Sequence, residues 1–255
     1  MHSVFGSVVT IIASILCSLA FLYLLHRVWP SSKRRQHNDV VGPSVEVLGT
    51  TYAVILAFML SGTWSNFRLA ENNTEQEANS LVNLYRLARA LPEGDCARIH
   101  QLIREYTMNM VNEEWPAMGQ GAISPKSHEI VEQIWKTLAQ IQPQTTAQQL
   151  SLDHSLSEMS TFTQFRRSRQ LQSRSQLPAM LWAVLIVGAI VTLASACLFG
   201  VEDFRIHMVQ IFLLSFMISL VLISISNIDQ PFRGTVHVSS DSFRFALDTF
   251  HQDGQ

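Results

Sequence analysis

Charged residues are scarce in this chain, and four long stretches lack them altogether. Only 15% of the 255 residues are Asp, Glu, Lys or Arg, against about a quarter in ordinary soluble domains. The four charge-free runs are Val4–Leu25, Val47–Ser65, Leu177–Val201 and Met208–Ser226. Each is close to the ~20 residues that a helix needs to cross a hydrocarbon layer about 30 Å thick. The sequence therefore predicts an integral membrane protein with four transmembrane helices arranged as two pairs.

Cysteine is also rare, and the three residues present, Cys17, Cys96 and Cys197, share no close spacing. An odd and scattered set argues against a disulfide framework and against a zinc site, so we expect no bound metal. The first apolar run has no basic segment before it, whereas a signal peptide would have one. Its basic cluster follows the run instead, so we interpret the run as a membrane helix.

Motifs that carry chemistry are missing as well. The formal net charge is only −2, and no basic tract is interleaved with aromatic residues, so no nucleic-acid partner is expected. The chain has no nucleophile elbow, no phosphate-binding glycine loop and no H-E-x-x-H spacing. Glu113 and Glu114 are adjacent and point to different sides of a helix, which disfavours a carboxylate pair. We predict no catalytic or cofactor-binding residue and no enzyme, and the absence of ionisable groups inside the spans disfavours a proton-coupled transporter.

Glycine and proline are absent for a long stretch after Trp64, until Pro92. Apolar and small residues keep helical spacing over this polar stretch, which favours one uninterrupted helix from about Val45 to Ala90. Ser44 is its expected N-cap. At 1.5 Å per residue, such a helix is roughly 70 Å long.

The rest of the polar region also has helical periodicity and no strand alternation. We expect a helix capped by Asp95 that runs to about Trp115, and a second that starts at Ser124 and Pro125. A third begins at Thr145 or Thr146. The predicted fold is therefore all-α: a polytopic membrane protein with an extramembrane helical bundle between spans 2 and 3. The expected segments are 1–65 (first hairpin), 66–176 (helical domain), 177–226 (second hairpin) and 227–255 (tail).

The tail combines a turn with a short amphipathic helix. We expect Thr235–Val238 to be extended, followed by a helix capped by Ser239 or Ser240. The helix either lies on the membrane surface or packs against the bundle.

Two residue ladders repeat every four positions along the second span. The first consists of small residues that allow another helix to approach closely: Gly49, Ala53, Ala57, Ser61 and Ser65. The second, one step round the helix, is Thr50, Val54 and Phe58. Packing within the bundle, or contact with lipid, accounts for both ladders. Alternatively, a ring of such side chains from several subunits forms a hydrophobic constriction that gates by dewetting.

Several short motifs give the chain a family resemblance. Leu48-Gly49 through Phe58, with the polar helix beyond, resembles the second helix of bestrophins, and Asp229-Gln230-Pro231-Phe232-Arg233-Gly234 resembles their Asn-Pro-Phe-Gly turn. Most of the chain is similar to the bestrophin-like family (the DUF4239 group). The matching stretches are Glu77-Ala78, Leu84-Tyr85-Arg86, Glu114-Trp115-Pro116-Ala117-Met118 and Pro231-Phe232.

The resemblance implies a homo-oligomer in the membrane, since bestrophins are pentameric anion channels. It places the pore neck on Thr50, Val54 and Phe58, and chloride is the implied anion. It also gives a post-span turn at Asp229, Pro231, Phe232 and Gly234. Thr50 departs from the family pattern, because it is small and polar where bestrophins usually have a larger apolar side chain. Two further departures concern whole segments. Met59-Leu60-Ser61 replaces the Arg-Asn-Asn that follows the bestrophin phenylalanine, and Thr235-Val236-His237-Val238 replaces an acidic calcium-binding run. The last departure argues against calcium gating by that route.

Basic residues near the span ends are almost evenly divided between the two sides of the membrane. One side has Arg27, Lys33, Arg34, Arg35 and Arg205; the other has Arg68, Arg166, Arg167, Arg169, Arg174, Arg233 and Arg244. Resemblance to bestrophins favours the plasma membrane, with cytoplasmic termini and a cytoplasmic helical domain. The leading functional hypothesis is an anion channel. The alternative is a membrane-anchored sensor or scaffold whose helical domain binds a partner without transport.

Overall fold

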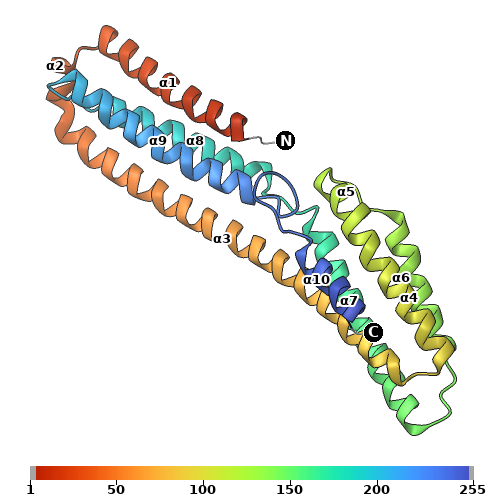
Figure 1. The fold of residues 1–255 in the computed structure, drawn as a ribbon. Coiled ribbons are helices and arrows are strands. Elements are labelled where there is room, and N and C mark those ends of the chain that lie inside the picture. Colours follow the sequence, from red (N-terminus) through yellow and green to blue (C-terminus); the bar gives the residue numbers. More distant parts are fainter. Residues whose placement is uncertain (1–3, 253–255) are drawn as a thin grey trace. The chain divides into compact units, whose positions relative to one another are not determined.

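The computed structural model describes residues 4–252, and every regular element within them is a helix. The chain divides into two compact units. The membrane unit consists of Met1–Ser65 and Gln176–Asp229, and the helical unit of Asn66–Ser175 and Gln230–Gln255. Helix α3 (Asn38–Leu87) contributes residues to both units. Figure 1 gives the order of the helices along the chain. The all-α class is thus confirmed.

The membrane unit contains α1 (Val4–Val28), the first part of α3, α8 (Ala179–Leu198) and α9 (Phe204–Ile228). Among the described residues, four helices are long and apolar enough to cross a membrane, and they are these four. The predicted spans are therefore confirmed. Much of their apolar surface is exposed in the single chain, as expected where lipid or a second subunit is the neighbour.

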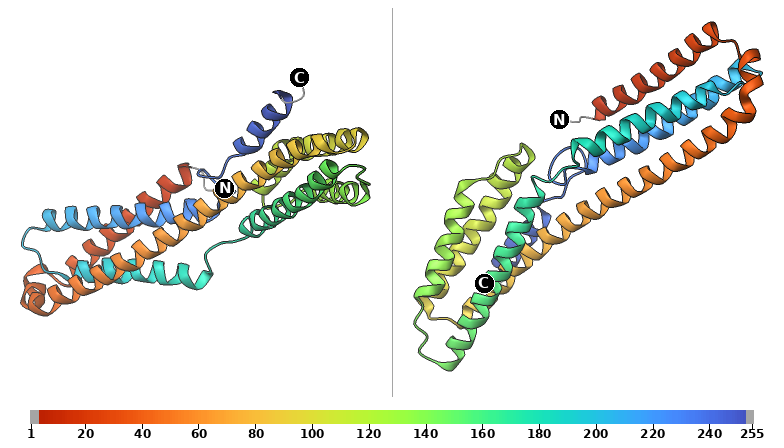
Figure 2. Two further views of the ribbon diagram at one scale, coloured as in Figure 1. Left: turned by 90° about the horizontal axis from the view of Figure 1, so that it is seen from below. Right: turned by 180° about the vertical axis from the view of Figure 1, so that it is seen from behind.

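Hydroxyl groups join α1 to α9, which lie side by side in Figures 1 and 2. The Ser14 and Ser219 hydroxyls are 2.5 Å apart, and those of Ser18 and Ser215 are 3.2 Å apart. Lipid exerts no hydrophobic force between helices, so close packing of small residues and interhelical hydrogen bonds hold such a pair together.

Helix α3 begins earlier than the sequence predicts. A short helix α2 (Ser31–Arg34) and a 3-10 turn (Arg35–His37) lead directly into Asn38. The Asn38 amide donates to the Gly200 carbonyl at 2.9 Å and accepts from the Gly200 N–H at 2.8 Å. This tertiary contact fixes the helix start at Asn38. The prediction of Ser44 as N-cap is wrong, because Ser44 lies inside the helix and its hydroxyl bonds to the Val40 carbonyl.

The far end of α3 agrees with the sequence. The helix continues without a break to Leu87 and closes in a 3-10 turn, Ala88–Ala90. The predicted uninterrupted helix therefore exists, because no residue of the polar stretch breaks the backbone hydrogen-bond pattern.

Among the described residues, the helical unit adds six elements to the second part of α3 and its closing 3-10 turn. They are α4 (Glu93–Asn109), a π-helical turn η3 (Met110–Glu114) that runs into α5 (Trp115–Gly119), α6 (Pro125–Gln140), α7 (Thr146–Gln172) and α10 (Asp241–Gln252). Helix α7 starts at Thr146, in agreement with the predicted start at Thr145 or Thr146, and Thr145 caps it by accepting from the Gln148 N–H. Asp95 is not a cap: Pro92 occupies that place and Asp95 lies in the first turn.

The tail helix α10 packs on the helical unit through Phe243, Ala246 and Phe250, which join the same buried core as Tyr106 and Phe162. Burial of three apolar side chains favours this position over a membrane surface. The run 235–238 was expected to be extended. Instead it is irregular, because the Val238 N–H turns back to the Pro231 carbonyl at 2.7 Å and Gly234 has a φ of 85°.

Candidate functional site

Both four-residue ladders lie on the face of α3 that the membrane unit leaves uncovered. Phe58 is 74% exposed and Val54 is 49% exposed, and Thr50 is exposed as well. The Thr50 hydroxyl donates to the Glu46 carbonyl at 2.7 Å within the helix. Its hydrogen-bond donor is therefore already used, and the three positions together form a mainly apolar surface.

The small-residue ladder runs beside the larger one. Ala53, Ala57, Ser61 and Ser65 are exposed and Gly49 is partly exposed. Apart from the backbone of its own helix turn and its chain neighbours, no atom of the described residues would lie within 4 Å of a Cβ built on Gly49. These positions therefore do not pack against the chain's own helices, and they leave a flat strip where a further helix or lipid can approach.

The opposite face of α3 holds the helix to its own chain. Tyr52 is buried, and its hydroxyl donates to the Leu185 carbonyl on α8 at 2.8 Å. A Cβ added at Gly188 would lie 2.5 Å from the Tyr52 ring, so the glycine makes room for the aromatic side chain. Anchoring one face in this way orients the other face, which carries Thr50, Val54 and Phe58.

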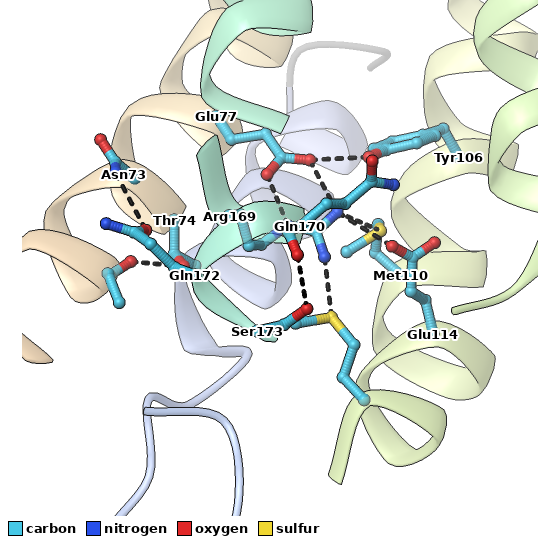
Figure 3. A network of polar contacts seen from close by, with 12 residues as sticks. Asn73, Thr74, Glu77, Tyr106, Met110, Glu114, Arg169, Gln170, Gln172 and Ser173 are labelled. Atoms are coloured by element: carbon cyan, nitrogen blue, oxygen red, sulfur yellow. Dashed lines mark hydrogen bonds and ion pairs between the residues drawn. The ribbon is translucent and has the colours of Figure 1, made fainter. Parts of the chain in front are cut away.

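A second notable arrangement is a buried charge network in the helical unit (Figure 3). Arg169 on α7 donates to Glu77 on α3 through Nε at 2.6 Å and Nη2 at 3.2 Å. Nη2 also reaches Glu114 at 3.0 Å. The Tyr106 hydroxyl on α4 donates to Glu77 Oε1 at 2.7 Å. All four side chains are fully buried, so this network joins three segments of the bundle through charge-assisted hydrogen bonds.

Soft and aromatic groups surround the guanidinium of this network. Arg169 Nη1 lies 2.8 Å from the Met118 sulfur, and the guanidinium carbon is 5.7 Å from the centre of the Trp115 ring. The π-helical turn that ends at Glu114 adds one residue to the helix repeat and places Glu114 inward, whereas Glu113 pairs with Lys126 at 3.8 Å on the surface. The two adjacent glutamates therefore point apart, as the sequence predicts. Single π turns of this kind occur often at functional positions.

The electrostatics of the network follow from burial and charge. Burial alone would lower the pKa of the Arg169 guanidinium, but the neighbouring Glu77, Tyr106 and Glu114 outweigh it and raise the pKa above its ordinary value. Burial, followed by the charge of Glu77, raises the pKa of the Tyr106 hydroxyl well above its usual range. The arginine therefore stays charged and the tyrosine stays a hydrogen-bond donor at any physiological pH.

Sequence reasoning missed the role of Arg169. Both Arg166 and Arg169 were counted among the basic residues beside the spans, yet Arg166 is only 7% exposed and Arg169 is fully buried. The available signal was their spacing: both continue the buried helical repeat of Met159 and Phe162. A long arginine side chain at a core position needs a buried acidic partner, and the sequence alone does not say which glutamate supplies it.

The residues of the post-span turn have separate structural roles. Asp229 Oδ1 accepts a hydrogen bond from the Leu177 N–H at 2.8 Å, closing the membrane unit between α8 and α9. Phe232, in the helical unit, is buried at a ring-centre distance of 5.7 Å from Trp115. Pro231 supplies the carbonyl that binds the Val238 N–H, and Gly234 supplies the positive φ that turns the chain back.

Within residues 4–252, no group of three or more His, Cys, Asp or Glu side chains is placed to hold a metal ion. The three cysteines are free thiols. The two notable features are therefore the exposed, mainly apolar face of α3 in the membrane unit and the buried charge network in the helical unit.

Comparison with known proteins gives a consistent result. The family profile of the Bestrophin-like domain matches residues 12–243. Two crystal structures of a bacterial bestrophin homologue from Klebsiella pneumoniae, each with a single substitution, have TM-scores of 0.72 and 0.73 at 13% and 12% identity. Both alignments cover 96% of this chain, and 99% and 100% of the homologue. A third structure of that homologue has a TM-score of 0.71 at 13% identity, covering 96% and 99%. No curated protein matches the chain.

Proposed function

This chain belongs to the bestrophin-like family, and from that premise we propose that it assembles into a homo-oligomeric channel that passes anions such as chloride. The observation that supports the proposal is the uncovered face of α3, with Thr50, Val54 and Phe58 on one line and a strip of small residues beside it. The fold shared with bacterial bestrophin homologues supports a channel-like assembly.

The proposed mechanism depends on a ring of α3 helices. The small ladder, from Gly49 to Ser65, lets neighbouring copies approach closely. The second ladder then faces the axis, where repeated Phe58 and Val54 side chains form an apolar neck. Such a constriction holds no charge to bind an ion, so it controls passage by wetting and dewetting. The anion preference of the family would then come from groups outside the neck.

We further propose that the protein lies in the plasma membrane among lipids, with its termini and helical unit in the cytoplasm. Family resemblance supports this orientation. The basic residues do not decide it, because burial of Arg166 and Arg169 on that side, and of Arg34 on the other, leaves the two sides nearly equal. The test is a Lys136→Cys variant, because Lys136 is exposed on α6. In intact cells an impermeant maleimide should label it only after the membrane is permeabilised.

The decisive experiment measures halide flux in liposomes that contain the purified oligomer. Wild-type protein should pass halide, and Phe58→Ala should raise the flux several-fold, because a smaller side chain widens the neck and favours water within it. The matched control is Phe5→Ala, since Phe5 is an exposed phenylalanine of a different span (78% exposed, against 74% for Phe58). Its flux should equal that of the wild type.

Two results would contradict the channel. One is absence of flux from well-folded oligomers, combined with no effect of Phe58→Ala. The other is a monomer in mild detergent, because a central pore needs a ring of subunits. A monomer would favour the membrane-anchored sensor or scaffold, in which the helical unit binds a partner and no solute crosses.

A further inference from the structure

Arg34 is an isolated buried cation in the membrane unit. It ends the short helix α2, and its side chain is fully buried. Its Nη1 group donates to the Cys197 carbonyl oxygen at the end of α8. The other two nitrogens, Nε and Nη2, are buried and have no hydrogen-bond partner among the described residues. The guanidinium is therefore held through Nη1, while the edge formed by Nε and Nη2 is unused.

The described part of the chain supplies no acidic partner for this guanidinium. Glu202, on the loop after α8, pairs at 3.3 Å with Arg35, the exposed neighbour, and Asp203 caps α9 through the Arg205 N–H at 2.8 Å. Within residues 4–252, Arg34 forms no ion pair with any acidic side chain. A guanidinium keeps its charge at physiological pH. Burying that charge without a counterion is costly, so an anion from outside the chain would stabilise the fold at this position.

The surroundings add to the attraction for an anion. His207 on α9 lies beside this segment, since its Nε2–H donates to the carbonyl of Ala196, the residue before Cys197, at 3.3 Å. Lys33 and Arg35 flank Arg34 on the exposed side of the same segment. Glu202 offsets the charge of Arg35, but no acidic side chain among the described residues pairs with Arg34 or Lys33, so the local potential is positive.

The geometry of the unused edge also fits an anion. Nε and Nη2 lie on the same side of the planar guanidinium, and their N–H bonds are nearly parallel. Such a pair holds one halide ion between two donors, or binds two oxygens of one oxyanion. A lysine has no comparable edge, because its ammonium group is a point charge on a flexible stem.

The backbone around Arg34 is fixed in advance. Asn38 binds both the N–H and the carbonyl of Gly200, and a Cβ at Gly200 would collide with the backbone of Arg34 and Arg35. Only a glycine allows the loop after α8 to lie this close. The Cys197 carbonyl holds the guanidinium, and the Asn38 amide holds the neighbouring loop at Gly200, which lowers the entropy lost on binding.

A cleft lies next to this region. It measures about 250 Å³ and is lined by Ala196, Phe199 and His207, among others. Ala196 directly precedes Cys197, whose carbonyl oxygen binds Arg34. The cleft therefore borders the backbone that holds the guanidinium.

From these observations we propose that Arg34 is the centre of a binding site for a small inorganic anion, held by Nε and Nη2 beside His207. A free ion is favoured over a lipid phosphate because the guanidinium is fully buried within one chain. The site lies on α2 and the loop after α8, away from the proposed neck residues, and its occupancy does not require conduction.

Bromide binding to the full chain in mild detergent tests the site. Sodium gluconate keeps the ionic strength constant while bromide replaces it, and intrinsic tryptophan fluorescence follows thermal unfolding. The wild-type unfolding temperature should rise with the logarithm of the bromide concentration above the Kd, by on the order of 5 °C when bromide is about a hundred times its Kd. Arg34→Gln should lose this rise. Arg35→Gln, which changes the exposed neighbour, should keep it.

A second variant separates binding from folding. Arg34→Lys keeps the charge and removes the paired donors, so its bromide affinity should fall at least tenfold even if Arg34→Gln fails to fold. Anomalous scattering from bromide-soaked crystals should place the ion beside Nε and Nη2. Equal bromide effects in the wild type and both Arg34 variants would overturn the proposal. So would a lipid phosphate or a carboxylate from a second subunit at that edge. Because none of these readouts is a flux, a failed channel assay would leave them unaffected.

Discussion

At the scale of single residues, the most constrained position is Arg169. It connects Glu77 to Glu114 and sits beside Tyr106, with all four side chains buried. One positive charge faces two carboxylates, so removal of the arginine would leave both carboxylates without a counter-charge. The Glu77-Ala78 and Glu114-Trp115 motifs behind the family resemblance therefore supply the two acidic partners of one buried base.

Replacing Arg169 with methionine should destabilise the helical unit strongly. Arg169→Met keeps much of the side-chain volume but leaves two carboxylates buried without a counter-charge. Breaking a buried ion pair in this way typically costs about 3–5 kcal/mol. The measurement is the unfolding midpoint by circular dichroism. Arg167→Met, two positions along the same helix and exposed, should change stability by less than about 0.5 kcal/mol. Equal stability of the two variants would contradict the proposed role.

His100 should make the helical unit sensitive to acid. Its Nε2–H donates to the Tyr85 carbonyl at 2.7 Å, and its ring stacks on Tyr85 at 3.6 Å. Burial lowers the pKa of His100, the hydrogen bond to Tyr85 partly opposes this, and Arg104 and Arg89 lower it further. Below about pH 6.5 the unfolded chain takes up a proton that the folded chain does not. The free energy of unfolding therefore decreases as the pH is lowered.

The unfolding temperature at pH 7 and at pH 5 measures this effect. In His100→Gln the fall between the two pH values should be smaller than in the wild type. His128→Gln is the control, because His128 is exposed on α6 and should leave the fall unchanged. An identical fall in His100→Gln and the wild type would show that other groups carry the acid sensitivity.

At the scale of elements, α3 has two faces with different tasks. In the membrane unit, one face binds α8 through Tyr52 and Leu56. The other face is exposed within the described structure, and it carries Val54 and Phe58. The contact between Tyr52 and Gly188 sets the rotation of α3 about its own axis. If α3 rotated, the Tyr52 ring would meet a residue larger than glycine.

The Tyr52–Gly188 contact predicts a sharp response to one methyl group. Gly188→Ala would place a Cβ 2.5 Å from the Tyr52 ring, which forces the ring away and weakens its hydrogen bond to Leu185. Overpacking of this kind costs about 1–3 kcal/mol. Gly94→Ala makes the same chemical change on α4, where nothing lies within 4 Å, and should not lower the unfolding temperature. A neutral Gly188→Ala would mean that the helices separate readily at this contact.

At the scale of the whole molecule, the single chain leaves one face of α3 exposed in the membrane unit. An exposed strip of small residues on α3 gains nothing from water or from the chain's own helices, and it suits close contact with another copy. Ala57→Phe should therefore reduce the subunit number measured by native mass spectrometry. Val187→Phe adds similar bulk at an exposed position on α8 (58% exposed) and should leave the assembly intact. An unchanged oligomer in Ala57→Phe would place the subunit contact elsewhere.

The sequence by itself determined the four spans, the long helix α3 and the all-helical class. These follow from local rules: a charge-free run must be helical in lipid, and a stretch without glycine or proline continues a helix already begun. The Thr145 cap and the opposite directions of Glu113 and Glu114 were predictable for the same reason, since each depends on residues within one turn or two.

Only the tertiary structure decided which side chains meet. Arg169 and Glu77 are 92 residues apart in sequence. Arginine also occurs at many surface positions, so no short stretch of the sequence identifies this pair. The start of α3 at Asn38 depends on Gly200, 162 residues away. Burial of Arg34 likewise depends on where the end of α8 lies. Long-range contacts of this kind are set by how whole helices pack, and short-range periodicity does not contain that information.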